Sequence, residues 1–86
     1  MTMHPIRLRY FASLREALGA SEEVACAPGL TLGQLRDQLI ARGGRHAEVL
    51  ARGRALRCAL NQVMADEATV VSAGAEVAFF PPVTGG

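Results

Sequence analysis

Apolar and polar residues alternate near the start of the chain, as they do in a β-strand with one buried face. Ile6, Leu8 and Tyr10 are separated by arginines, so the three apolar side chains would point to the same side of a sheet. Three later segments are also predicted as strands: 22–26, 56–61 and 76–80.

A helical period follows the second of these strands. Thr31 and Gln34 fit a capping box, in which each side chain bonds the backbone N–H of the other residue. The same helical face would carry three leucines: Leu32, Leu35 and Leu39. Gly43-Gly44 is expected to end this helix. Two shorter helices are predicted at 13–18 and 45–50.

The order of these elements predicts an α+β domain, with one mixed sheet and the main helix across one of its faces. The first and last strands are expected to be neighbours in the centre of the sheet. The domain would cover residues 1–80, followed by an extended tail at 81–86. Pro81 and Pro82 favour an extended backbone, whereas Gly85-Gly86 would form a thin, flexible tip.

Composition narrows the classes of function. The 86 residues make one small domain, and the net charge of +1 argues against binding nucleic acid through bulk electrostatics. All nine basic residues are arginine, which excludes lysine nucleophiles, Schiff bases and a P-loop. No apolar run approaches the roughly 20 residues of a membrane span. The first residues lack signal-peptide features, so a cytoplasmic protein without membrane association is expected.

No cluster of side chains predicts an internal active site. Cys26 and Cys58 lack the spacing of a zinc site and are expected to be buried, reduced thiols. Glu22 and Glu23 would point to opposite faces of a strand, and Asp66-Glu67 is expected to be a solvated turn. If the chain takes part in chemistry, we expect it to do so as a carrier or a substrate.

The group best suited to a carrier is the terminal carboxylate of Gly86. A carboxylate is a poor electrophile, so it would first need activation, usually as an acyl-adenylate made from ATP. The sequence contains no recognisable ATP site. A partner enzyme would therefore bind the domain and draw the tail into its own active site. Residues 81–86 would span at most roughly 20 Å when extended.

Three segments of the chain resemble the small subunit of molybdopterin synthase. They are 6–18, the Ala-Leu-Asn-Gln run at 59–62, and 74–86 with its closing Phe-Phe-Pro-Pro-Val-Thr-Gly-Gly. That family consists of sulfur carriers with a ubiquitin-like β-grasp fold, and the resemblance implies the same fold here. The chain departs from the family at Ala73 and Ala75, where an Asp-Gly-Asp turn is usual.

The resemblance implies that this chain supplies sulfur while its partners supply catalysis. An enzyme of the ubiquitin-activating type would adenylate Gly86 with ATP, and a sulfur donor would convert it to a thiocarboxylate. Gly85 would help the loaded tip to enter the large synthase subunit. There, two deliveries to cyclic pyranopterin monophosphate would make the molybdopterin dithiolene. The resemblance implies a heterotetramer, and no metal or permanently bound cofactor on this chain.

The resemblance also implies which residues contact the large subunit. Phe80 would be an apolar anchor on the strand face opposite Val77 and Phe79. Met64 would be an exposed apolar contact beyond the Asn-Gln turn, and Arg15 a polar contact on the first short helix. The tail completes this set of partner-binding residues: Pro81, Pro82, Val83 and Thr84.

Two other interpretations stay open. The chain could be a related β-grasp carrier that serves thiamine, cysteine or tRNA thiolation; such carriers share the Gly-Gly end but less of the string before it. It could also be a non-catalytic β-grasp interaction module with an inert tail. Intact mass after expression with a sulfur donor system separates a carrier from a module, because only a carrier exchanges one oxygen for sulfur.

Overall fold

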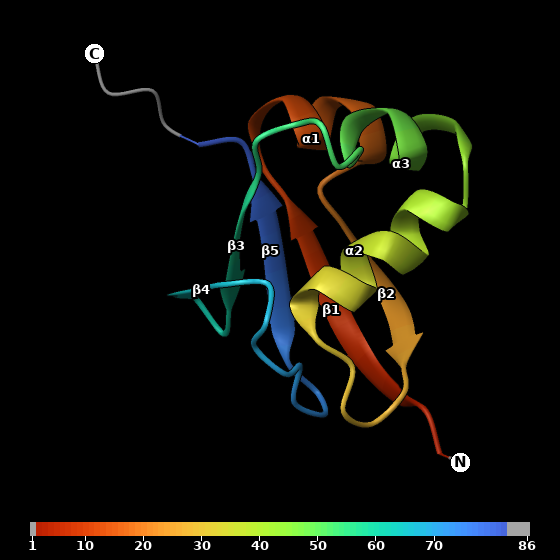
Figure 1. Cartoon of the computed structure of the whole chain (residues 1–86), viewed down its shortest axis with the longest axis vertical. Helices are drawn as coiled ribbons and strands as arrows, with labels where there is room; N and C mark the ends of the chain where they lie inside the picture. Colours follow the sequence, from red (N-terminus) through yellow and green to blue (C-terminus); the bar gives the residue numbers. More distant parts are fainter. Residues whose placement is uncertain (1, 83–86) are drawn as a thin grey trace.

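The computed structural model describes residues 2–82, which form one mixed sheet and three helices (Figure 1). The elements in chain order are β1 (His4–Tyr10), α1 (Ala12–Leu18), β2 (Ser21–Cys26), α2 (Leu32–Ala41), α3 (Gly44–Val49), β3 (Arg57–Leu60), β4 (Val63–Ala65) and β5 (Glu76–Phe80). Every predicted strand and helix is present, and β4 is an additional strand. No helix within the described residues is long and apolar enough to cross a membrane.

The strand order in the sheet is β2-β1-β5-β3-β4. β1 and β5 pair in parallel, and all other neighbours are antiparallel. The prediction that the first and last strands are central neighbours is therefore confirmed. In Figure 1, α2 passes in front of β1, while α1 and α3 gather at the end of the sheet where β5 finishes.

The core fills the space between α2 and the sheet. The predicted helical stripe is buried, and each of its three leucines is at most 2% exposed. The apolar face of β1 is buried against it, together with Val77 and Phe79 from β5. Cys26 and Cys58 are buried, unpaired thiols, as predicted, and burial raises the pKa of both.

The predicted capping box fixes the start of α2. The Thr31 hydroxyl accepts a bond from the backbone N–H of Gln34 at 3.1 Å, and the Gln34 side chain accepts one from the N–H of Thr31 at 2.9 Å. Two further N–H groups of the first turn donate to carbonyls of a distant loop: Leu32 to Thr69 and Gly33 to Glu67, both at 2.9 Å. The first turn is thus anchored to the segment that precedes β5.

Gly33 lies where this loop approaches the helix closely. A Cβ built at position 33 would lie 3.0 to 3.3 Å from atoms of Glu67, including its backbone oxygen. A side chain at this position would require Glu67 to shift by a few tenths of an ångström. The absence of a side chain at Gly33 therefore lets the loop at Glu67 pack close to the helix backbone; Gly33 is not needed here for an unusual backbone angle.

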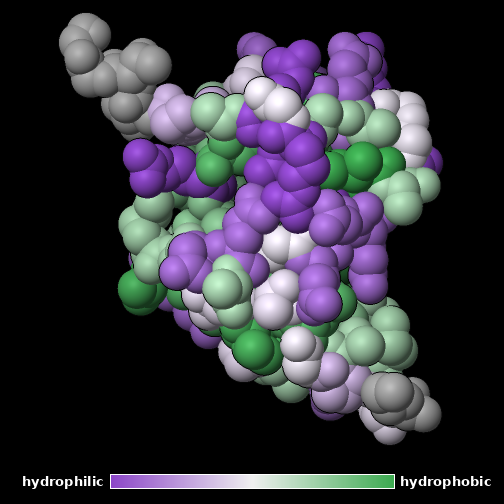
Figure 2. All heavy atoms as spheres, in the orientation of Figure 1, coloured by the Kyte–Doolittle hydropathy of each residue, from purple (hydrophilic) through white to green (hydrophobic). Residues whose placement is uncertain are grey.

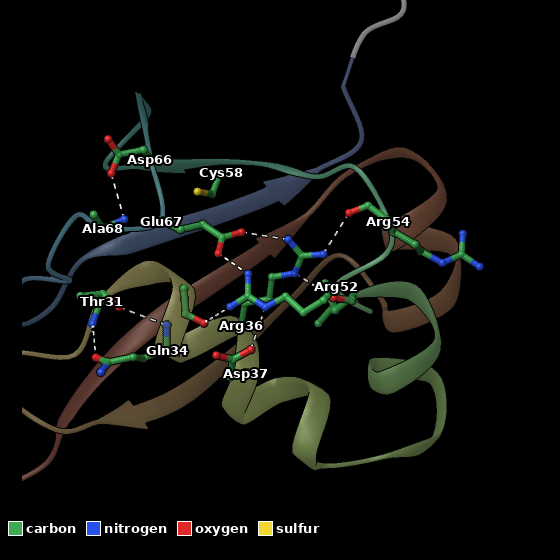
Figure 3. Close-up of polar contacts among 12 residues, drawn as sticks. Thr31, Gln34, Arg36, Asp37, Arg52, Arg54, Cys58, Asp66, Glu67 and Ala68 are labelled. Carbon is green, nitrogen blue, oxygen red and sulfur yellow. Dashed lines mark hydrogen bonds and ion pairs between the residues drawn. The ribbon is translucent and has the colours of Figure 1, made fainter.

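The prediction that Asp66-Glu67 is a solvated turn is wrong for Glu67. Its carboxylate pairs with Arg36 at 2.9 Å and with Arg52 on the other side (Figure 3). Arg36 is only 3% exposed, and a buried guanidinium needs such partners. Its remaining N–H groups donate to three backbone carbonyls that precede β3: Leu50, Ala51 and Arg54. Glu67 is therefore part of the link between α2 and two loops.

Two tight turns shape the sheet on either side of this link. Asn61 and Gln62 both have positive φ, the conformation of a two-residue hairpin turn that suits strand twist. This turn folds β4 back onto β3. Before β5, Gly74 has φ +73° and the N–H of Ala75 donates to Ser72 at 3.1 Å. The turn therefore forms with Ala73 and Ala75 at the two positions where small subunits of molybdopterin synthase usually have aspartate.

Candidate functional site

The candidate site begins where β5 ends. Phe79 is buried in the core, whereas Phe80 points to the opposite face and is half-buried. Pro81 and Pro82 follow it without regular structure. Because β5 is the central strand, this exit point is held by hydrogen bonds on both sides, from β1 and β3.

The register of the strands brings two of the predicted contact residues onto one face. Phe80 lies opposite Arg57 on β3, and Ala78 lies opposite Ala59, which in turn lies opposite Met64 on β4. Residues directly opposite or two apart in a sheet share a face. Phe80 and Met64 therefore lie on the same surface, the sheet face that α2 does not cover. We call it the open face.

Small and apolar side chains form the middle of the open face. Ala78 and Ala59 separate Phe80 from Met64, so the surface between the two larger residues is shallow. Met64 is 57% exposed. The helix-covered face differs: Figure 2 shows hydrophilic side chains through its middle and hydrophobic ones only in separate patches. Exposed apolar surface of this kind is typical of a protein interface.

Phe11 belongs to this site, although the sequence pattern did not single it out. Its ring meets that of Phe80 edge to face, with centroids 6.3 Å apart, and it is 40% exposed. Its backbone N–H donates to Phe79 at 3.3 Å. The signal in the sequence is the phenylalanine directly after the buried Tyr10, which the alternation of β1 places on the open side.

Arg15 is exposed on α1, one turn beyond Phe11. Within residues 2–82, no hydrogen bond or ion pair joins its side chain to the open face. The structure thus brings Phe80 and Met64 together and leaves Arg15 on the adjoining helix. Its role, like that of the other predicted contact residues, stays a prediction. The calls on Val83, Thr84, Gly85 and Gly86 lie outside the described residues.

No group of three or more His, Cys, Asp or Glu residues between positions 2 and 82 could hold a metal ion. A shallow groove beside Pro81, formed by α1, α3 and the segment before β3, contains Arg54 as its charged residue. The chemistry that this geometry favours is presentation of the chain's end to another protein.

Glu22 is a structural residue on the other side of the sheet. The strand alternation places it opposite Leu8 and places Glu23 opposite Arg7, so the two carboxylates point to opposite faces as predicted. Glu22 accepts hydrogen bonds at 2.7 to 2.8 Å from three residues of other elements: Tyr10, Arg42 and His46. These bonds hold β2 against the helices.

Comparison with known proteins identifies close relatives of the whole chain. The model of the ThiS family matches residues 8–86. The molybdopterin synthase sulfur carrier subunit of Escherichia coli (strain K12) is 38% identical over 81 residues, which cover 94% of this chain and 99% of the relative. The subunit of that name from Mycobacterium tuberculosis (strain H37Rv) is 37% identical over 86 residues, covering 98% and 100%.

Solved structures show the same fold. Small archaeal modifier protein SAMP1 from Haloferax volcanii matches with a TM-score of 0.74 at 26% identity, over 95% of this chain and 99% of that one. Subunit 1 in a complex with subunit 2 of the molybdopterin-converting factor from Helicobacter pylori gives 0.64 at 24% identity, over 95% and 99%.

Ubiquitin from Caldiarchaeum subterraneum has a TM-score of 0.59 at 15% identity, over 99% and 100% of the two chains, and so shares the fold alone. The expected ubiquitin-like β-grasp fold is therefore confirmed. With the family match over residues 8–86 and relatives aligned over almost their whole length, this chain belongs to the ThiS family and is a close relative of the sulfur carrier subunits of molybdopterin synthase.

Proposed function

We propose that this chain is the sulfur-carrier small subunit of molybdopterin synthase. The observation that carries the proposal is the nearly end-to-end match, at 35 to 38% identity, to three relatives that all have this function in their names. The open face and the central position of β5 support it, because they suit a protein that docks on a partner and presents its end.

The reactive group in this proposal is the carboxylate of Gly86. Its oxygen attacks the α-phosphate of ATP on an activating enzyme, which releases pyrophosphate and leaves an acyl-adenylate. A sulfide-level donor then attacks the carbonyl carbon, a C–S bond forms, and AMP leaves. Each delivery to cyclic pyranopterin monophosphate breaks the C–S bond of the thiocarboxylate, and a water molecule supplies the oxygen that restores the carboxylate. Two deliveries complete one dithiolene.

The partners supply what the described residues of this chain lack. The activating enzyme holds ATP, the sulfur donor provides the nucleophile, and the large subunit provides the catalytic side chains for sulfur transfer. The Helicobacter pylori neighbour is a complex of subunits 1 and 2, which supports a large subunit as the docking partner. We propose a heterotetramer in the cytoplasm, with no cofactor bound permanently to this chain.

Docking uses the open face, and delivery uses the tail. Phe80, Phe11 and Met64 form the apolar contact, and Arg15 adds a polar contact from α1. Pro81 and Pro82 restrict the backbone directly after the docked strand. The remaining residues carry the carboxylate into the partner's active site: Val83, Thr84, Gly85 and Gly86.

The test is to append one alanine after Gly86. We expect the extended protein to unfold in urea as the parent does, since the core consists of residues before the tail. With the activating enzyme, ATP and a sulfur donor, the parent should gain the mass of one oxygen-to-sulfur exchange, and the extended protein should support no molybdopterin formation.

Three outcomes would contradict parts of the proposal. Molybdopterin formation by an extended protein that stays untrimmed would exclude Gly86 as the reactive residue. Sulfur loading of the parent without transfer to the pterin precursor would favour a carrier for another thiolation pathway. No loading at all would favour an inert interaction module.

A further inference from the structure

Charges on the open face are distributed unevenly along the strands. In a row two residues farther from the tail than Arg9, Arg7 lies directly between Glu23 on β2 and Glu76 on β5. One arginine is thus flanked by two carboxylates on the same face. This end of the open face carries a small excess of negative charge.

The half of the open face nearest the tail is positive instead. Arg9 lies between Ser21 and Ala78, and Arg57 lies opposite Phe80. The nearest acidic contact of Arg9 is Glu76, at a long 3.8 Å. Arg57 is exposed and, among residues 2–82, has no carboxylate within ion-pair distance.

Both arginines adjoin the apolar contact. The guanidinium of Arg9 lies 5.4 Å from the centroid of the Phe11 ring, and Arg57 is the cross-strand neighbour of Phe80. A partner that covers these phenylalanines must also remove water from the two guanidinium groups. Such desolvation is costly unless the partner supplies carboxylates that pair with them.

We propose that the partner surface seated on the open face carries carboxylates opposite Arg9 and Arg57, and that these pairs set the rate and the direction of docking. The inference rests on the proposed function, which makes the large synthase subunit this partner. Long-range attraction between the basic half and an acidic surface accelerates encounter. The acidic row at the other end disfavours the reversed orientation, because Glu23 and Glu76 would then face those carboxylates.

The proposal is tested with the double variant Arg9→Glu/Arg57→Glu and the large subunit from the same organism. Association and dissociation rates are measured at low and high NaCl. At low salt we expect the double variant to associate about tenfold more slowly than the parent or slower still. The association rate of the parent should fall steeply with salt, and that of the double variant should not.

Arg45→Glu is the matched control, because Arg45 is exposed on α3, away from the open face. It makes the same change per site in net charge and should leave the association rate within about twofold of the parent. Arg57→Gln serves as a milder variant, since it removes one exposed charge without introducing a new one. It should show an intermediate loss of rate and keep the urea midpoint of the parent.

The outcomes separate this inference from the proposed function. If the parent binds the large subunit but the double variant and the Arg45→Glu control associate equally fast, the electrostatic inference is wrong and the proposed function stands. If the parent does not bind the large subunit at any salt concentration, the proposed function itself fails, and the inference fails with it.

Discussion

Two adjacent phenylalanines at the end of β5 point to opposite faces of the sheet. Phe79 is 1% exposed and packs in the core, whereas Phe80 is half-buried on the open face against Phe11. Strand alternation alone separates them, because successive side chains point to opposite sides of a sheet. The pair therefore offers an internal comparison between stability and binding.

Replacing Phe80 by alanine should weaken binding to the large subunit by about 2 kcal/mol or more, as is common for aromatic interface anchors. Its effect on the free energy of unfolding should be smaller than that of Phe79→Ala, which we expect to cost about 3–5 kcal/mol. Urea unfolding and affinity measurements on both variants check this. A large stability loss for Phe80→Ala, with unchanged affinity of the folded fraction, would assign Phe80 to the core.

At the residue scale, the sequence pattern predicted which side chains are buried, but it did not predict which polar side chains pair with one another. The buried faces of β1 and α2 follow from period alone, and so does the separation of Glu22 from Glu23. The partners of Glu22 and Glu67 could not be predicted, because Arg42, His46, Arg36 and Arg52 come from other elements whose placement depends on the folded sheet. Phe11 was missed for a similar reason: its contact with Phe80 depends on the register between β1 and β5, which the sequence pattern does not provide.

At the scale of elements, Glu22 connects β2 to both β1 and the helices. Burial raises the pKa of this carboxyl, but hydrogen bonds from His46, Arg42 and Tyr10 outweigh burial and lower the pKa from 4.5 to about 2. Burial and the bond to Glu22 raise the pKa of Tyr10 above its usual value. The Glu22 side chain is 22% exposed, so solvent screens its hydrogen bonds only in part.

This lowered pKa makes the stability of the domain depend on acid. Because the folded pKa lies below the unfolded one, the unfolded state binds more protons as pH falls from about 5 towards 2. The contribution of ionised Glu22, on the order of 2 kcal/mol, is present above pH 5 and is lost over that interval. Urea unfolding from pH 7 to pH 2.5 measures it.

Glu22→Gln is the matched variant, because it keeps the shape of the side chain and removes the titration. It should be less stable than the parent at neutral pH, and the difference in free energy of unfolding should shrink towards zero as pH falls below 3. A difference that stays constant across the whole range would show that Glu22 acts through shape alone.

The strand β4 could not be predicted from the sequence pattern. Its three residues are too few for a period, and Asn61-Gln62 lacks the glycine that usually marks a two-residue hairpin turn. Asn61 and Gln62 both adopt positive φ in spite of this, and the turn that they form joins β3 to β4 as a hairpin. Met64 was predicted as a contact residue from the resemblance alone, and its position beside Ala59 comes from the pairing of β4 with β3.

At the scale of the molecule, the strand that is last in sequence is the one in the middle of the sheet. β5 separates β1 from β3 and contributes Val77 and Phe79 to the core. A chain lacking β5 would leave β1 and β3 without their shared neighbour. The domain should therefore fold only when β5 is present.

A truncated chain that stops at Ser72 tests this. We expect it to show no cooperative urea transition, whereas a chain that stops at Pro82 should keep the midpoint of the full-length protein, because the core and the sheet are then complete. Far-UV circular dichroism follows both. A cooperative transition in the shorter chain would mean that β5 is dispensable for folding.

The central position of β5 also has a mechanical consequence. A partner that draws the tail into its active site pulls along the axis of β5, which β1 flanks in parallel and β3 in antiparallel orientation (Figure 1). Such a force loads the hydrogen bonds on both sides together, in shear, instead of opening them one after another as peeling an edge strand would. The tail thus continues from a strand that is bonded along both edges, and tension applied at its end is shared by the hydrogen bonds to β1 and to β3.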